Sequence, residues 1–191
     1  MAAWNGELKY LYPKAIIECY EPDKETFAIL EKNVKNNKLS DVKCLNEAVS
    51  GEPGELDFYS FWDMEWWPGN TLEKNQVTFE NIHSYKVKVI ALSQKKYGII
   101  DFLKIDIEGS EWKVFHDLEK SGMIKNIERF SLEYHYDFFS KENSLAKIIS
   151  ILEKNNFNII INVNTLVDFY ITENYYNKFN KKYVLVLDCF Q

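Results

Sequence analysis

The densest group of acidic side chains follows an apolar run in the middle of the chain. Residues 99–105 form this run, and Asp106-Ile107-Glu108-Gly109-Ser110-Glu111 comes directly after it. Carboxylates placed in this way can hold a cationic amino group, coordinate a substrate or remove a proton, and they also favour the N-terminus of a following helix. Both uses can hold at once. We expect Asp106 to face a ligand and Glu108 to contact the substrate.

A second candidate pair follows a later apolar run at 127–134. Glu133 and His135 stand two residues apart, so their side chains point to the same side of an extended strand. A histidine that titrates near neutral pH beside a carboxylate suits proton removal from a hydroxyl. A lone histidine is more often structural, so His135 is favoured by its position alone. As catalytic base we rank His135 first, then Glu133, then Asp106.

Two further strand ends carry residues that suit a nucleoside. Glu21 and Pro22 follow the run 15–20, and an acidic side chain there can accept hydrogen bonds from both ribose hydroxyls of an adenosine-type cofactor. A surface carboxylate ahead of a helix has the same pattern. After the run 42–45, Asn46-Glu47-Ala48 is placed to meet an adenine edge, with the small Ala48 letting the ring approach. A plain polar turn explains this second signal nearly as well.

These residues need a scaffold of alternating strands and helices. Apolar runs at 15–20, 42–45, 55–61, 85–90, 99–105, 127–134, 157–163 and 183–189 predict strands. Helical spacing follows Asp23, begins again near Trp112, and recurs over 145–152. This rhythm predicts an α/β domain with a mostly parallel sheet, an antiparallel excursion at 55–61 and an antiparallel hairpin at the end. Ligand chemistry is then expected at the carboxyl ends of the strands.

Bulk properties limit the partners. The 191 residues, 46% hydrophobic and 27% charged, fit one domain spanning 1–191. A formal net charge of −6 gives no basic footprint for nucleic acid. Three scattered cysteines, together with the absence of a signal-peptide pattern or an apolar stretch of membrane-spanning length, predict a reduced, cytoplasmic protein with no membrane partner.

Four phrases resemble the FkbM-type methyltransferases in order and interval, over roughly residues 7–135. They are Cys19-Tyr20-Glu21-Pro22-Asp23, Asn46-Glu47-Ala48-Val49-Ser50, Phe102-Leu103-Lys104-Ile105-Asp106-Ile107-Glu108-Gly109-Ser110-Glu111 and Leu132-Glu133-Tyr134-His135. The resemblance implies a Rossmann-like class I methyltransferase fold that uses S-adenosylmethionine, commonly to methylate hydroxyl groups of sugars or natural products. By position it places Glu21 at the ribose, Asn46 to Ala48 near the adenine, and Asp106 at the methionine end or the substrate.

One part of the family pattern is missing. Members carry a strand and a glycine-rich loop ahead of a Tyr-Pro-Lys-Ala phrase, whereas only ten residues precede Leu11-Tyr12-Pro13-Lys14-Ala15 here. We therefore expect an N-terminally truncated sheet that binds the cofactor poorly as it stands. The absent strand belongs between the strands at 15–20 and 99–105. That place is then closed by direct pairing, filled by a second copy through self-association, or occupied by residues upstream.

The resemblance predicts transfer of a methyl group to a small-molecule hydroxyl. Such transfer needs no metal, because the cofactor carries a good leaving group. Trp62, Trp66 and Trp67 lie in an aromatic stretch that suits a sugar or aromatic acceptor, or that simply covers the sheet. Two other functions stay open: a non-catalytic methyltransferase-like binding or scaffold domain, and a nicotinamide-dependent oxidoreductase, although GxGxxG is absent.

Overall fold

The first parallel unit carries the ribose-binding candidate. The computed structural model describes residues 9–60, 70–74, 83–136, 142–163 and 183–190. In it, β1 (Ile17–Tyr20) and β2 (Val42–Leu45) pair in parallel and are joined by α2 (Lys24–Asn36). The helix begins where the sequence predicts, because the Asp23 side chain accepts a hydrogen bond from the Thr26 amide at 2.8 Å. The β1 strand is two residues shorter than predicted.

A small three-stranded sheet forms the excursion. Its order is β3 (Ala48–Val49), β5 (His83–Ile90), β4 (Gly54–Ser60), and β4 runs antiparallel to β5, which confirms the prediction. Ala48 and Phe58 are buried there with Val87 and Val89 in a core of their own. The strand β3 was not predicted, because two residues are too few to show an alternating pattern.

The larger sheet carries the acidic motif and the hairpin. Its order is β6 (Leu103–Ile105), β7 (Arg129–Tyr136), β9 (Tyr183–Phe190), β8 (Asn158–Val163). The β6 and β7 strands are parallel, whereas β9 is antiparallel to both of its neighbours, so the predicted final hairpin is confirmed. The predicted strand at 99–105 is mostly wrong, since ahead of Leu103 only an isolated bridge joins Ile100 to Ile127.

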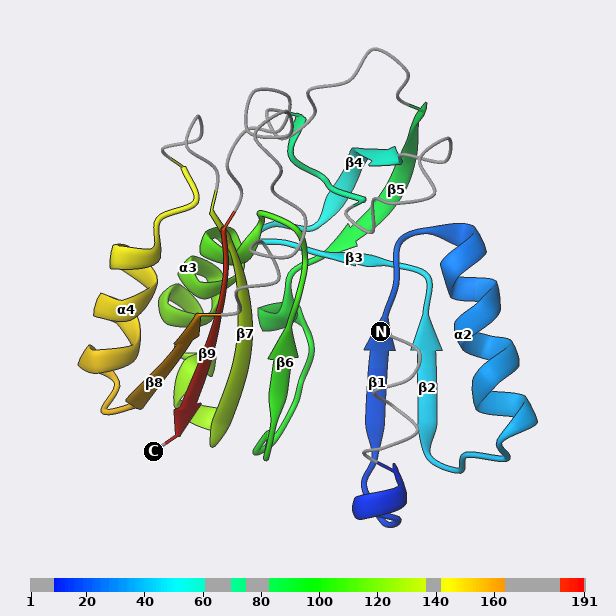
Figure 1. Ribbon diagram of the computed structural model, residues 1–191, viewed down its shortest axis with the longest axis horizontal. Helices are drawn as coiled ribbons and strands as arrows, with labels where there is room; N and C mark the ends of the chain where they lie inside the picture. Colours follow the sequence, from blue (N-terminus) through cyan, green and yellow to red (C-terminus); the bar gives the residue numbers. More distant parts are fainter. Residues whose placement is uncertain (1–8, 61–69, 75–82, 137–141, 164–182, 191) are drawn as a thin grey trace.

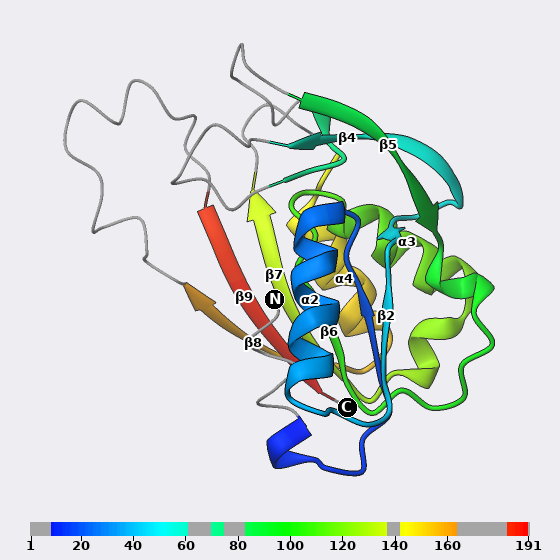
Figure 2. The same ribbon diagram turned by 90° about the vertical axis from the view of Figure 1, so that its right-hand side faces the viewer.

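Two helices bury the main core beside this sheet. They are α3 (Glu111–Ser121) and α4 (Leu145–Lys154), which lie next to each other in both views (Figures 1 and 2). Phe115 and Leu118 from α3 and Leu152 from α4 are fully buried with Phe130 of β7. None of the helices in the described ranges is long and apolar enough to cross a lipid bilayer.

The β1–β2 pair and the larger sheet lie side by side, with β1 and β6 facing each other (Figure 1). Among the described residues, β1 pairs only with β2 and β6 pairs only with β7. A cavity of about 1730 Å³ lies between them, lined by β1, by β6 and by exposed apolar side chains such as Ile16 and Ile99. Direct pairing of these two strands is therefore not the solution that this chain adopts.

Candidate functional site

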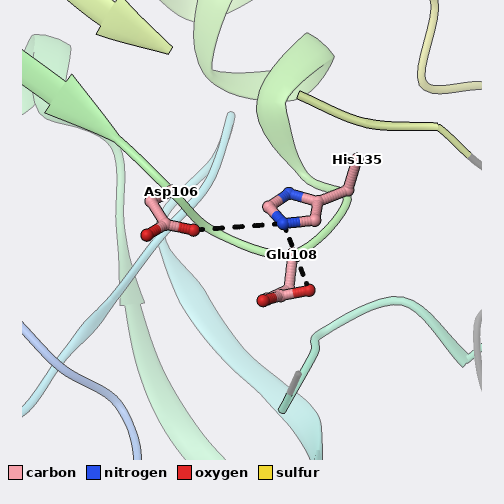
Figure 3. Close-up of side chains that lie close together, drawn as sticks. All are labelled: Asp106, Glu108 and His135. Atoms are coloured by element: carbon pink, nitrogen blue, oxygen red, sulfur yellow. Dashed lines mark ion pairs between the residues drawn. The ribbon is translucent and has the colours of Figure 1, made fainter. Parts of the chain in front are cut away.

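The carboxyl ends of β6 and β7 bring the predicted catalytic residues together. The two strands are parallel and pair Ile105 with Leu132, so Asp106 and His135 emerge at the same edge of the sheet. The Nε2 atom of His135 lies 4.0 Å from Oδ1 of Asp106 and 3.4 Å from Oε2 of Glu108. Figure 3 shows the imidazole pointing between the two carboxylates.

Glu111 holds the other nitrogen of the histidine. This glutamate is the first residue of α3, and its side chain is 0% exposed. Its Oε1 atom lies 2.8 Å from Nδ1 of His135 and accepts a hydrogen bond from the Gly109 amide at 3.0 Å. Because an ionised carboxylate only accepts hydrogen bonds, Nδ1 carries the proton and the ring orientation is set.

Asn143 donates a hydrogen bond to the second oxygen of the buried Glu111 carboxylate. Its Nδ2 group donates to Oε2 of Glu111 at 2.6 Å and to the His135 carbonyl at 3.0 Å. Its Oδ1 atom accepts from the Trp112 amide at 3.0 Å, while its carbonyl accepts from the Tyr134 hydroxyl at 2.7 Å. One buried amide thus connects the end of β7, the start of α3 and the segment before α4, which makes the imidazole position rigid.

Lys104 connects two of the base candidates. Its Nζ atom lies 2.9 Å from Oδ2 of Asp106 and 4.0 Å from Oε2 of Glu133. Asp106 therefore presents one oxygen to the lysine and the other to His135. All three base candidates border one site, and Lys104 balances part of the negative charge of Asp106 and Glu133.

Residues between β4 and β5 form hydrogen bonds to the turn that carries Glu108. Glu108 has a φ of 54° and Gly109 a φ of 106°, the left-handed region that suits glycine and strains other residues. The Thr71 hydroxyl donates to the Glu108 carbonyl at 2.6 Å. The Ser110 hydroxyl and the Lys113 ammonium both donate to Oε1 of Glu73 at 2.6 Å. Thr71 and Glu73, which lie between β4 and β5, thereby fix the backbone of the acidic motif.

The surrounding carboxylates change the titration of the histidine. Burial alone would lower the pKa of His135, but the hydrogen bond to Glu111 and the charges of Glu108, Glu111 and Asp106 outweigh burial and raise the pKa to about 9. The imidazolium is then the prevailing form at neutral pH when nothing else is bound.

The β1 end of the site is built around Glu21. The Glu21 side chain is buried, and its Oε1 atom accepts from the Asp23 amide at 2.9 Å. Burial raises the pKa of this carboxyl, and the nearby charges of Asp23 and Asp106 raise it further, against the lowering effect of the Asp23 amide. Within the described part of the chain no second donor serves this carboxylate, so it can accept hydrogen bonds from a ligand.

Asn46 joins the loops after β1 and β2. Its Nδ2 group donates to the Glu21 carbonyl at 2.8 Å and to the Pro22 carbonyl at 3.0 Å. Glu47 forms ion pairs with Lys88 and with Lys95, the second at 3.9 Å. In this structure Asn46 therefore positions the Glu21 loop, and the contacts of Glu47 run to Lys88 of β5 and to Lys95 in the segment after β5.

The remaining predicted residues fall in two places. Ala48 is buried in the core of the small sheet. Trp62, Trp66 and Trp67 lie outside the described residues, so their role stays a prediction.

The main residues that sequence reasoning missed are Glu111 as the histidine anchor, Asn143 and Lys104. Glu111 carries a signal, since it closes the acidic motif at a helix start. Asn143 carries none, because it lies in a polar segment remote from the motif in sequence. Lys104 lies within a mostly apolar strand, so the sequence does not single it out, but its ammonium group contacts Asp106 and Glu133.

Comparisons with known proteins concern the family and the fold. A family model described as Methyltransferase FkbM domain matches residues 9–159. No curated protein matches the chain. The crystal structure of Methyltransferase FkbM from Methylobacillus flagellatus KT superposes with a TM-score of 0.58 at 12% sequence identity, covering 97% of this chain and 40% of that one. This chain thus spans less than half of that protein, and at this identity the likeness concerns the mixed α/β fold. Because the family model covers most of its length, the chain belongs to the FkbM methyltransferase family.

Proposed function

We propose that this protein is an S-adenosylmethionine-dependent methyltransferase that methylates a hydroxyl group on a sugar or a small natural product. The observation that carries the proposal is the meeting of Asp106, Glu133 and His135 at the carboxyl ends of two parallel strands. Family membership supports the reaction class, and the acidic residue at the end of β1 supports the cofactor.

Glu21 fits the ribose of the cofactor. Its buried carboxylate has one described donor, the Asp23 amide, and burial together with the charges of Asp23 and Asp106 raises its pKa. Ribose hydroxyls are donors of this kind, and a ligand that carries positive charge is favoured between Glu21 and Asp106. Asn46 and Pro22 contribute by fixing the backbone on which Glu21 stands.

The reaction needs a proton acceptor and a fixed geometry. S-adenosylmethionine supplies an electrophilic methyl group with a neutral leaving group. The residues of this chain must hold the acceptor hydroxyl and remove its proton. The candidates for that proton are His135, Glu133 and Asp106, in this order. His135 acts as a base only after its own Nε2 proton has left, because its raised pKa keeps the ring protonated at neutral pH in the free protein. Glu108 and the aromatic residues 62, 66 and 67 are proposed to contact the acceptor.

A second function is favoured by the cavity between β1 and β6. No described strand lies between β1 and β6, where the resemblance places the strand that leads into the cofactor-binding loop. A non-catalytic binding domain is therefore the alternative. A nicotinamide-dependent enzyme is a third possibility, since an acidic strand end also recognises the ribose of NAD.

Paired calorimetry separates the three. Titration of the protein with S-adenosylmethionine and, separately, with NAD should give binding of the first ligand alone, and the cavity between β1 and β6 should make that binding weak. Binding of neither would favour the non-catalytic domain, and binding of NAD alone would favour the oxidoreductase.

A further inference from the structure

We infer that Asp106, Glu108 and His135 form a binding site for one divalent cation of the first transition row, of the Mn²⁺ or Zn²⁺ type. The ligand atoms are a carboxylate oxygen from each acid and Nε2 of the histidine, and all three lie within 4.8 Å of one another. The inference deepens the proposed function and rests on it for its chemical meaning, but the binding itself is a property of these three residues.

The spacing of the three atoms suits an ion better than direct contact. A charge-assisted hydrogen bond joins nitrogen and oxygen at about 2.7–2.9 Å, as Nδ1 of His135 does with Glu111 at 2.8 Å. On the opposite side of the same ring, the two separations are 3.4 and 4.0 Å. An ion about 2.0–2.2 Å from each ligand separates neighbouring ligand atoms by roughly 3.0–4.2 Å. Both separations fall in that interval.

The histidine is prepared for metal binding by its second nitrogen. Its side chain is only 6% exposed, and Nε2 points into the space between Asp106 and Glu108 (Figure 3). Metal-bound histidines almost always donate their other N–H to a carboxylate or carbonyl, which sets the tautomer and aims the ligand lone pair. Glu111, fully buried and bonded by Asn143, occupies that supporting position.

The described side chains around His135 also carry an excess of negative charge, which favours a cation. Among the described residues, the carboxylates of Asp106, Glu108 and Glu111 lie beside His135, while Lys104 is shared between Asp106 and Glu133. A divalent ion offsets this excess, and the mixed imidazole and carboxylate ligands favour a transition metal over Mg²⁺.

The consequence concerns how the acceptor loses its proton. A cation at this position lowers the pKa of a hydroxyl that binds to it, so a weaker base suffices. His135 would then hold the ion, and the proton would pass to the carboxylate of Glu133, which shares Lys104 with Asp106. This departs from the expectation above that the reaction needs no metal.

The test measures metal binding without any other ligand. The whole chain is freed of metal with EDTA, the chelator is removed, and Mn²⁺ is titrated while the electron paramagnetic resonance signal reports the free ion. We expect one Mn²⁺ per chain, competition by Zn²⁺, and weaker competition by Mg²⁺. Asp106→Asn and Glu108→Gln, which keep side-chain size, should each weaken Mn²⁺ by about tenfold or more.

The control is Glu133→Gln, which removes a nearby charge but no ligand and should change Mn²⁺ affinity by no more than about twofold. His135→Ala should weaken Mn²⁺ binding as the two carboxylate variants do. If it fails to fold by near-ultraviolet circular dichroism, Asp106→Asn and Glu108→Gln decide the question alone. Absence of saturable binding, or equal affinity in wild type, Asp106→Asn and Glu108→Gln, overturns the site. An equal loss in Glu133→Gln also overturns it, because that loss reports general charge. If the protein binds Mn²⁺ but does not bind S-adenosylmethionine, the metal site is supported and the proposed function is contradicted.

Discussion

The Nδ1 atom of His135 and the Oε1 atom of Glu111 lie 2.8 Å apart, although 24 residues separate them in the chain. This contact joins the end of β7 to the first residue of α3. It leaves the Nε2 atom of the imidazole directed toward Asp106 and Glu108, and it therefore decides whether His135 can act there as a base or as a metal ligand.

The first prediction tests this contact through stability. Glu111→Gln keeps the side-chain size but replaces an acceptor oxygen by an NH₂ donor, which must then face the N–H group of Asn143, Gly109 or His135. We expect the free energy of unfolding to fall by about 1–3 kcal/mol in urea titration. The matched control is Glu119→Gln, which removes a partly exposed ion pair to Lys154 and should cost no more than about 1 kcal/mol. Equal losses in the two variants would show that the buried contact has no special weight.

The second prediction concerns the ribose. In a form of the protein that binds S-adenosylmethionine, Glu21→Ala should weaken that binding by about 1.5–3 kcal/mol in calorimetry, because hydrogen bonds to a charged acceptor are lost. Glu25→Ala, at an exposed position in the first turn of α2, should leave the affinity unchanged. If the two variants bind equally well, Glu21 does not hold the ribose.

The third prediction ranks the proton acceptors once a methyl acceptor is in hand. His135→Ala should lower turnover by about 10²–10⁴-fold with cofactor affinity nearly intact. Glu133→Gln distinguishes the two ways in which this can happen. A small effect of Glu133→Gln, with no effect of EDTA, would make His135 the base. A large loss of turnover both in Glu133→Gln and on treatment with EDTA would mean that His135 holds an ion and Glu133 takes the proton. Full activity of His135→Ala together with loss in Asp106→Asn would reverse the ranking.

The fourth prediction is an acid-dependent stability that comes from Glu18. Burial alone would raise the pKa of Glu18, but hydrogen bonds from Tyr97, Tyr20 and Lys43 outweigh it and lower the pKa to about 2. The folded value lies below the unfolded one of about 4.5, so the contribution is complete above that pH and is lost as the pH falls from about 4.5 toward 2. Glu18→Gln should therefore reduce the free energy of unfolding by at most about 3 kcal/mol at pH 7, and by less at pH 4. Urea unfolding at both pH values checks this, and a difference that does not depend on pH would contradict it.

The fifth prediction concerns the open space between β1 and β6. Unpaired strand edges and exposed apolar side chains attract another chain, so we expect concentration-dependent self-association in analytical ultracentrifugation. Ile16→Lys and Ile99→Lys, at positions 87% and 65% exposed beside the cavity, should weaken it. Ile29→Lys on α2, 55% exposed and outside the cavity lining, is the control. A monomer at all concentrations, or equal effects of the three variants, would contradict association through this space.

The sequence by itself determined the alternation of strands and helices apart from β3, the helix start at Asp23, the final hairpin and the family. It also placed Asp106, Glu133, His135 and Glu21 at the ends of strands. These features depend on local periodicity, capping and short motifs, each of which is contained in a few neighbouring residues.

Only the tertiary structure decided which side chains meet. Asn143 reaches Glu111 across 32 residues and Asn46 reaches Glu21 across 25, and neither contact leaves a periodic signal in the chain. The burial of Glu111, the use of Ala48 as core and the separation of Nε2 of His135 from two carboxylates follow from how helices and sheets pack. Packing is set by contacts between segments remote in sequence. The residue types therefore predicted where chemistry occurs, while long-range packing determined how each atom is held there.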